Sequence, residues 1–405
     1  MQRKASIGII FFTVFLDLLG FGMVLPLMPL YASDPRFLAS PAEIGWLMAI
    51  YSLMQFLCAP LWGGLSDRIG RRPVLIIGLF GSALSYLIYG LAESFTILMI
   101  SRAVAGVMGA NIAAAQAAMA DLTPPEKRAQ GMGIIGAAFG LGFVVGPALG
   151  GLLSQHGAGA APLAAAAVTL LNAIAAIFLL AETKQAGGEN RGRPHPLSLE
   201  PWRTAGRYPA ALALCLLGGL YVTLFASFEV VLPLWAQEVM AWREPQAMYE
   251  AGKLFAYVGI VMVLVQGGLV RRLAPKLGEK KLTRIGIILV FVGWLLLGMA
   301  SDYAMLLGSL ALTAVGAGLV NPGLSSLVSL NTNAEHQGVM MGLFQSMSAL
   351  GRVLGPLWGG FAFAPFGGHV NFLAAIGLVV VFILFWSYRN RIADARERQT
   401  ATPAP

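Results

Sequence analysis

Charged residues are what this sequence has least of. Only 11% of its 405 residues are Asp, Glu, Lys or Arg, whereas an ordinary soluble domain carries about 25%. Residues 129–181 and 353–388 contain none at all. A helix that crosses a bilayer needs about 20 mainly apolar residues, so each stretch is long enough for more than one crossing. The scarcity excludes most soluble folds and predicts an all-α polytopic membrane protein.

Several other signatures are also missing. The two cysteines, Cys58 and Cys215, both fall in apolar stretches, so we expect packing thiols and neither a disulfide framework nor a metal site. Segments of about ten residues that alternate polar and apolar side chains are missing, which excludes a membrane β-barrel. The glycine-rich stretches lack the phosphate-loop pattern, so ATP drive is not indicated. We expect no enzyme activity and no cofactor.

The net charge of +8 reflects topology. The cations cluster between apolar stretches and form no single basic stripe, which argues against nucleic acid as a partner. With the N-terminus inside, 22 Lys and Arg residues fall in cytoplasmic segments and three on the other side. The positive-inside rule therefore predicts cytoplasmic termini in a cell membrane, for a bacterium the inner membrane.

Charged and Pro/Gly-rich breaks divide the chain into twelve predicted helices. An N-terminal bundle (1–182), a cytoplasmic linker (183–207), a C-terminal bundle (208–389) and a cytoplasmic tail (390–405) follow from this division. The linker also carries a predicted short interfacial helix near 201–207. The predicted helices are 7–31, 44–66, 74–93, 96–120, 130–154, 161–181, 209–236, 252–270, 284–300, 303–327, 337–361 and 370–388.

An internal repeat relates the two bundles. The string FGMVLPL at residues 21–27 recurs as FEVVLPL at 228–234. The string GFVVGPALGG at 142–151 recurs as GRVLGPLWGG at 351–360, at nearly the same offset. Six crossings return the chain to its starting side, so the copies are parallel. We therefore predict two six-helix bundles related by a pseudo-two-fold axis normal to the membrane, an arrangement suited to a central, alternately exposed site.

The turn after the second predicted helix carries a dense motif. Its sequence, GGLSDRIGRRP at residues 63–73, combines glycines for a tight reversal with an acid and three arginines. A topology loop alone needs neither the glycine spacing nor the acid. The second-half counterpart, GLVRRL at 268–273, is degraded. The first copy resembles the loop motif of the major facilitator superfamily, and its key positions are Gly63, Asp67, Arg68, Gly70, Arg71 and Arg72.

Two further motifs extend the resemblance. Arg102, with Gly106 and Gly109, is similar to an arginine motif that the superfamily's antiporters associate with proton coupling. Arg102 lies about 9 Å from the non-cytoplasmic end of its helix, so it either snorkels to the surface or serves function. A glycine stripe in the fifth helix favours tight packing and resembles the antiporter motif of drug:proton antiporters. Its residues are Gly142, Gly146, Pro147, Gly150 and Gly151.

The first half resembles tetracycline/proton antiporters and neighbouring multidrug exporters. The similarity includes LDLLGFG at 16–22, SLMQF at 52–56 and GAAFGLG at 136–142. Where tetracycline exporters carry acids in helices 3 and 9, this chain has Ser85 and Val290. The resemblance therefore implies proton-coupled export of small molecules, with tetracycline itself in doubt as substrate.

Four charges fall well inside predicted helices. Asp17 lies about 15 Å into its helix, close to the midplane, and Glu229 should lie about five residues, or 7 to 8 Å, further out. Burial disfavours a charged carboxylate, as a proton carrier requires. We assign proton coupling to Asp17, Glu229 and Arg102. The alternative is an ion pair of Asp17 or Glu229 with Arg352 that merely holds the halves together.

Polar and aromatic side chains near these charges are candidates for binding substrate, and each can equally serve helix packing. The leading function is a monomeric, proton-coupled antiporter in the bilayer that exports lipophilic or amphiphilic molecules by alternating access, with Asp17 shared by proton and substrate. The alternatives are a transporter of an anionic metabolite held by Arg352, and a membrane receptor or scaffold without flux. The substrate-binding candidates are Asp17, Phe21, Gln55, Asn111, Gln116, Phe225, Phe228, Glu229, Gln266 and Arg352.

Overall fold

The computed structural model describes residues 2–124, 127–183, 200–243, 246–333 and 335–388. All regular secondary structure in these ranges is helical. Eleven stretches are long and apolar enough to cross a membrane, and the last, Gln337–Tyr388, contains two separate helices joined by a 3₁₀ turn. The twelve predicted spans are therefore confirmed, and the chain divides into two compact units.

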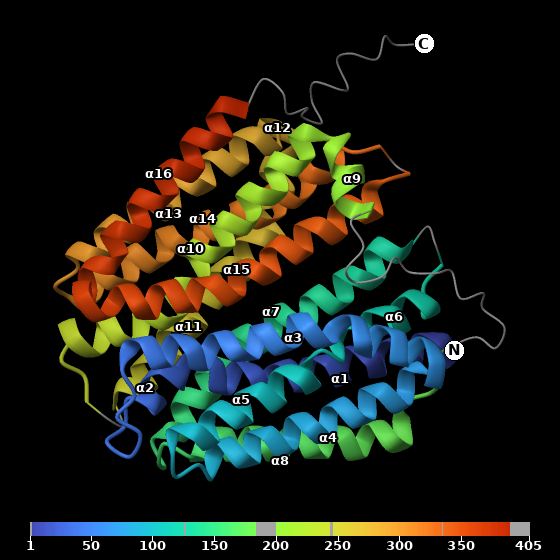
Figure 1. Ribbon diagram of the computed structural model, residues 1–405, viewed down its shortest axis with the longest axis horizontal. Helices are drawn as coiled ribbons and strands as arrows, with labels where there is room; N and C mark the ends of the chain where they lie inside the picture. Colours follow the sequence, from blue (N-terminus) through green and yellow to red (C-terminus); the bar gives the residue numbers. More distant parts are fainter. Residues whose placement is uncertain (1, 125–126, 184–199, 244–245, 334, 389–405) are drawn as a thin grey trace. The chain divides into compact units, whose positions relative to one another are not determined.

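Unit 1 comprises Met1–Arg193 together with Ala241–Ala256. In it α1 packs on α7, α4 on α8 and α3 on α5 (Figure 1). The first predicted span is interrupted near Pro26 by a 3₁₀ turn, and the fourth breaks near Asn111. The elements are α1 (Gln2–Val24), η1 (Leu25–Leu27), α2 (Met28–Ala32), α3 (Pro41–Ile69), α4 (Arg71–Gly90), α5 (Phe95–Gly109), α6 (Ile112–Leu122), α7 (Arg128–Ser154) and α8 (Ala160–Leu179).

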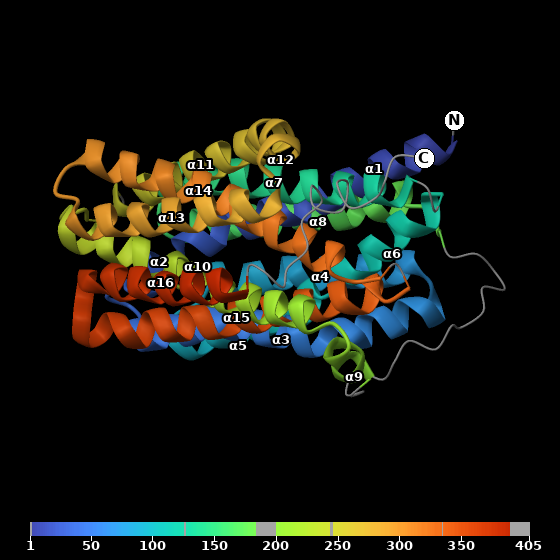
Figure 2. The ribbon, with the colours of Figure 1, turned by 90° about the horizontal axis from the view of Figure 1, so that it is seen from above.

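Unit 2 comprises Pro194–Met240 and Tyr257–Pro405, so α11 begins in unit 1 and continues in unit 2. Here α10 packs on α15, and α13 packs on both α14 and α16 (Figure 2). The elements are α9 (Glu200–Gly206), α10 (Pro209–Val239), α11 (Gln246–Leu264), the π-helical η3 (Val265–Val270), α12 (Arg271–Leu277), α13 (Glu279–Met299), α14 (Tyr303–Leu330), α15 (Gln337–Phe366), η4 (Gly367–His369) and α16 (Val370–Tyr388).

The linker is described only in part. The short helix predicted near 201–207 is present as α9. Most of the predicted linker, at residues 184–199, and the predicted tail lie outside the described residues. The predicted domain boundaries therefore stay predictions.

Side-chain caps fix where several helices begin. Ser40 and Glu43 form a capping box at the start of α3, in which each side chain bonds the other residue's backbone N–H. Asp302 accepts a hydrogen bond of 2.8 Å from the backbone N–H of Met305 at the start of α14. These caps satisfy N–H groups that have no partner inside the helix.

Glycine stripes bring one pair of helices into backbone contact in each unit. In unit 1 the stripe of α7 faces α1, and a Cβ added at Gly146 would lie 2.7 Å from the backbone of Gly22. In unit 2 the stripe of α15 faces α10, and a Cβ added at Gly355 would lie 2.5 Å from the carbonyl oxygen of Thr223. The sequence repeat thus corresponds to the same kind of helix–helix contact in both units.

The contacts correct the predicted depth of Glu229. Gly146 faces the carbonyl of Leu19, and its repeat Gly355 faces that of Thr223. This register makes Tyr221 the counterpart of Asp17 and places Glu229 about eight residues, or 12 Å, beyond that level. The prediction of about five residues was wrong because it aligned the prolines. Pro26 lies in a 3₁₀ turn, whereas α10 continues through its proline without a break.

The second copy of the loop motif also lies elsewhere than predicted. Residues 268–273 fall in η3 and α12. The turn that matches Gly70, with φ of 105°, is Gly278, with φ of 79°, because each is the single residue between two helices. Both glycines adopt positive φ, which residues with a Cβ rarely do.

Candidate functional site

Arg102 is completely buried in unit 1. Its guanidinium carbon lies 5.5 Å from the ring centre of Tyr86 and 4.8 Å from that of Tyr89, both on α4. Its Nε and one terminal amino group have no hydrogen-bond partner among the described residues. Snorkelling to the membrane surface, one of the two predicted alternatives, is therefore wrong. The charge is held inside the unit by two aromatic faces.

Asp17 lies on α1 with its side chain partly exposed. Among the residues that the structure describes, none donates a hydrogen bond to it or forms an ion pair with it. Tyr86 lies within electrostatic range of both Asp17 and Arg102. The two predicted proton-coupling residues of unit 1 thus share one electrostatic neighbour, a tyrosine that the sequence did not single out. An aromatic residue in an apolar helix gives no signal that would distinguish it.

The other predicted substrate residues of unit 1 lie in three different settings. Phe21 and Gln55 meet around Tyr51: the rings of Phe21 and Tyr51 are 4.9 Å apart, and Gln55 Nε2 donates to the Tyr51 hydroxyl at 3.3 Å. Asn111 is buried and packs against Gly78 of α4, which is a packing role. Gln116 is exposed.

In unit 2, aromatic rings form a stack along α10. Successive ring centres of Tyr221, Phe225 and Phe228 lie 5.9 and 6.1 Å apart, and the last lies 6.3 Å from Trp294 of α13. Phe228 is 4% exposed, so in this structure it belongs to the core, whereas Phe225 is partly exposed. Only Phe225 of this stack presents surface to a ligand.

The charged candidates of unit 2 are close to one another. Glu229 is partly exposed and lies within electrostatic range of Arg352, which is exposed. This proximity is consistent with both alternatives weighed for the pair, a coupling site and an ion pair. Gln266 is exposed in the π-helical segment η3.

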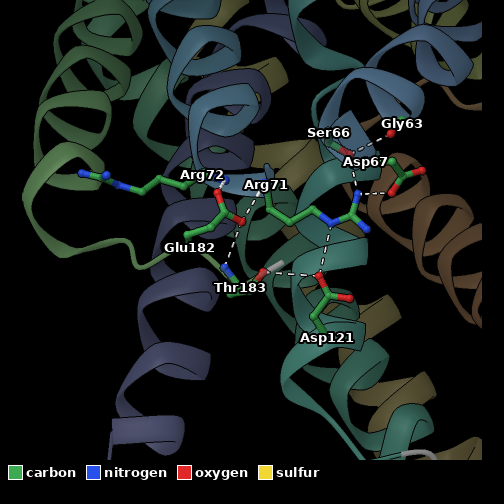
Figure 3. A network of polar contacts seen from close by, with 8 residues as sticks. All are labelled: Gly63, Ser66, Asp67, Arg71, Arg72, Asp121, Glu182 and Thr183. Atoms are coloured by element: carbon green, nitrogen blue, oxygen red, sulfur yellow. Dashed lines mark hydrogen bonds and ion pairs between the residues drawn. The ribbon is translucent and has the colours of Figure 1, made fainter. Parts of the chain in front are cut away.

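The loop motif forms a polar network centred on Arg71 (Figure 3). The guanidinium donates to Asp67 at 2.5 Å, to Ser66 at 2.7 Å and to Asp121 at 3.2 Å. The acids come from α3 and α6, so one side chain of α4 links three helices. Asp121 was not predicted, although an acid at the end of an apolar span on the same side was a usable signal. Arg68 is exposed.

A third acid, Glu182, caps α4. Its carboxylate accepts from the backbone N–H of Arg71 at 2.9 Å and of Arg72 at 3.2 Å (Figure 3). Gly70 has no side chain to serve as a cap, and a Cβ there would clash with Glu182. The carboxylate therefore takes the place of an N-cap side chain. Contact with Glu182 therefore accounts for the glycine at position 70. No contact accounts for Gly64, where an added Cβ would meet nothing within 4 Å.

The antiporter-type stripe of α7 has a second contact at its far end. A Cβ added at Gly151 would lie 3.0 Å from the Cα of Gly252 in α11. One added at Gly252 would lie 2.5 Å from the carbonyl oxygen of Pro147. The two helices therefore cross in backbone contact. Gly252, which the sequence did not single out, is as tightly placed as the motif residues.

Comparison with known proteins identifies the family. The sequence model of the Major Facilitator Superfamily matches residues 10–277 and 269–404. The chain is 32% identical over 404 residues to the class C tetracycline resistance protein of Escherichia coli, which covers 99% of this chain and 100% of that protein. It is 31% identical over 443 residues to major facilitator superfamily domain-containing protein 10 of Mus musculus, covering 98% and 95% of the two chains.

A solved structure agrees with these sequence matches. The crystal structure of the human organic anion transporter MFSD10 (TETRAN) superposes with a TM-score of 0.69 at 28% identity, covering 95% of this chain and 99% of that one. The family model spans nearly the whole chain, and the apolar helices have the length and composition of membrane spans. The chain therefore belongs to the major facilitator superfamily, and it is a multi-pass membrane transporter, not an enzyme.

Proposed function

We propose that this transporter is a proton-coupled antiporter that exports lipophilic or amphiphilic small molecules. The observation that carries the proposal is Asp17, an acid inside a membrane span with no ion-pair partner among the described residues. An intramembrane acid without a structural partner marks a transport pathway by default. The residue of the arginine motif in α5, Arg102, lies 5.5 Å from the ring centre of Tyr86, which is also within electrostatic range of Asp17.

In the proposed cycle, Asp17 is either protonated, or deprotonated while substrate is bound. Substrate binding favours release of the proton, and proton uptake from outside favours release of substrate. Rocking of the two bundles exposes the site alternately to each side. Glu229 provides a second titrating position. The orientation we propose has both termini in the cytoplasm, in a cell membrane, with the monomer as the working unit.

The proposed substrates are lipophilic or amphiphilic, and tetracycline itself is not among them, because two acids of tetracycline exporters are missing here. Ser85 donates to the carbonyl of Ser82 in its own helix at 2.7 Å, and Val290 is completely buried. Neither position offers an acid. Phe21 and Phe225 instead present partly exposed rings near the candidate charges, and a mainly apolar lining with few polar groups is typical of small-molecule sites.

Everted membrane vesicles test the proposal directly. Imposing an inward-acidic gradient should drive accumulation of a lipophilic cation such as ethidium by the wild-type protein, and Asp17→Asn should abolish it. Asp34→Asn, which removes an acid from the loop after α2, is the matched control and should transport normally. Wild-type accumulation by the Asp17→Asn variant, at equal expression, would show that the proton site lies elsewhere.

A second candidate function is transport of an organic anion. It is favoured by the exposed guanidinium of Arg352 and by the similarity to a protein described as an organic anion transporter. A thermal-shift screen with a carboxylate dye and with ethidium separates the two. Loss of the anion's stabilising effect in Arg352→Ala, with the cation's effect unchanged, supports the anion. A loss of the cation's effect alone rejects it.

A further inference from the structure

An arginine and a tryptophan from different helices meet where α13 begins and α16 ends. The guanidinium carbon of Arg284 lies 5.1 Å from the centre of the Trp386 ring. Its Nε donates to the carbonyl oxygen of Lys280, at 3.4 Å. Among the described residues, no group accepts a hydrogen bond from its two terminal amino groups. The charge is therefore fixed in place, with donors still available to a ligand.

Exposed side chains next to Arg284 and Trp386 extend this site along both helices. Lys281 is exposed and lies three residues before Arg284, on the neighbouring position of the same helix face. Further along, Ile285 and Ile288 of α13 are exposed, as is Ile383 of α16. Because α13 and α16 pack together, two cations lie at one end of an exposed aliphatic strip. We call Lys281, Arg284, Ile285, Ile288, Ile383 and Trp386 the α13–α16 surface.

The charge around this surface has one dominant sign. Residues 271–284 contain six Lys and Arg residues and a single acid, Glu279. Membrane topology alone accounts for cations in such a segment. It does not account for a guanidinium stacked on an exposed tryptophan of another helix. Tryptophan favours the membrane–water interface, where its ring is apolar and its N–H reaches polar groups.

We propose that the α13–α16 surface binds an anionic phospholipid. The phosphate of the headgroup accepts hydrogen bonds from Arg284 and Lys281, and the ester region lies beside Trp386. One acyl chain follows the strip of Ile285, Ile288 and Ile383. Each part of the lipid thus meets the side-chain type that suits it: cations for the phosphate, an amphipathic ring for the interface and aliphatic groups for the chain.

Native mass spectrometry of the full-length protein in a neutral detergent tests this proposal. Phosphatidylglycerol and phosphatidylcholine with the same acyl chains are titrated in parallel. One cation near anionic lipid contributes about fivefold in affinity. We therefore expect the double variant K281A/R284A to lose about 25-fold in phosphatidylglycerol affinity, on the same basis, with phosphatidylcholine unchanged.

The matched control is R203A/R207A, which removes two exposed cations from the α9 region of the same unit. It should bind phosphatidylglycerol as the wild type does. An equal loss in both double variants would mean diffuse attraction to positive charge and would overturn the site. So would wild-type affinity in K281A/R284A.

Two more variants keep the test valid if the double variant folds poorly. Arg284→Lys retains the charge and should lose less than threefold. Trp386→Leu removes the ring and leaves both cations, and it should shorten the residence of phosphatidylglycerol more than Trp386→Phe does. Unchanged residence in Trp386→Leu, in protein with a wild-type melting curve, would also contradict the proposed placement.

Discussion

The guanidinium of Arg102 lies 4.8 Å from the centre of the Tyr89 ring, and neither side chain reaches solvent. A desolvated cation on an aromatic face is stabilised by about 2 kcal/mol. We expect Tyr89→Leu to lower the free energy of unfolding by about this amount, because it removes the face and leaves the charge buried. Thermal unfolding in detergent, with wild type alongside, measures the loss.

Tyr89→Phe is the matched control for that substitution. It keeps the ring and removes a buried hydroxyl that has no hydrogen-bond partner among the described residues. We expect its stability to equal or exceed that of wild type, since an unpaired buried hydroxyl is unfavourable. If Phe and Leu destabilise equally, the ring face is not what holds Arg102.

Two glycines of α7 should respond oppositely to alanine. At Gly146 a Cβ would lie 2.7 Å from the backbone of Gly22, so α1 and α7 would have to separate. We expect Gly146→Ala to destabilise by about 1–3 kcal/mol. At Gly136 a Cβ meets nothing within 4 Å. Gly136→Ala should be neutral or stabilise by about 0.5–1 kcal/mol, because alanine favours the helix.

Melting curves of both alanine variants in the same detergent decide this prediction. The substitutions are chemically identical and lie in one helix, so differences in expression or helix propensity cancel. A similar shift for both would show that the stripe does not pack as the structure has it.

The sequence predicted the features that lipid imposes on a chain and missed those that depend on distant partners. The spans follow from apolar length, because a membrane admits few alternatives to a helix. The loop residues around Arg71 were recognised by their own pattern. Glu182 was not, because it bonds Arg71 from 111 residues away. The burial of Arg102 likewise depends on where α4 places two tyrosines, which no local pattern encodes.

Repeat alignment had a similar limit. Matching prolines gave the right pair of helices, because the strings that contain them are nearly identical. It gave the wrong depth for Glu229, because the prolines are not equivalent positions: Pro26 follows Gly22 by four residues, whereas Pro233 follows Ala226, the counterpart of Gly22 in the glycine contact, by seven. Only the contacts of Gly146 and Gly355 set the register.

Removal of Glu182 should destabilise the start of α4. Its carboxylate accepts from two backbone N–H groups that have no partner within the helix. We expect Glu182→Ala to lower the free energy of unfolding by about 1 kcal/mol, the usual effect of losing a cap. Glu182→Gln keeps one acceptor and should lose less. Equal losses in the two variants would mean that the side chain acts through charge alone.

The loop after α2 should contribute a small part of the protein's stability, and this part should be lost in acid. The hydrogen bond from the Arg36 side chain lowers the pKa of Asp34 below its ordinary value of 3.8. A lowered pKa in the folded state means that the ionised form stabilises the fold. This contribution is present at pH 7 and disappears as the pH falls below about 4.

Asp34→Asn measures that contribution. Because the side chain of Arg36 is 49% exposed, we expect the variant to be less stable than wild type by under about 1 kcal/mol at pH 7. The difference should shrink as the pH falls below about 4. Melting temperatures of both proteins from pH 7 to pH 3 give the comparison, and a difference that grows toward acid would contradict the sign.

Arg71 should be replaceable by neither alanine nor lysine. Its planar guanidinium bonds Asp67, Asp121 and Ser66 at once. A lysine ammonium keeps the charge but cannot match that fork. We expect Arg71→Lys to lower the free energy of unfolding by about 1.5–3 kcal/mol, the range for hydrogen bonds to charged groups, and to slow transport. Arg71→Ala should lose at least as much, because both acids then lose the guanidinium that joins them.

Thr183→Val provides the control for the same network. The Thr183 hydroxyl makes only a long bond of 3.4 Å to Asp121, so its loss should change stability by less than about 0.5 kcal/mol. Urea-induced unfolding in mixed micelles, followed by tryptophan fluorescence, ranks the three variants. If Arg71→Lys matches wild type in both stability and transport, the positive charge is sufficient, and the geometry that joins α3, α4 and α6 through one side chain has no functional role.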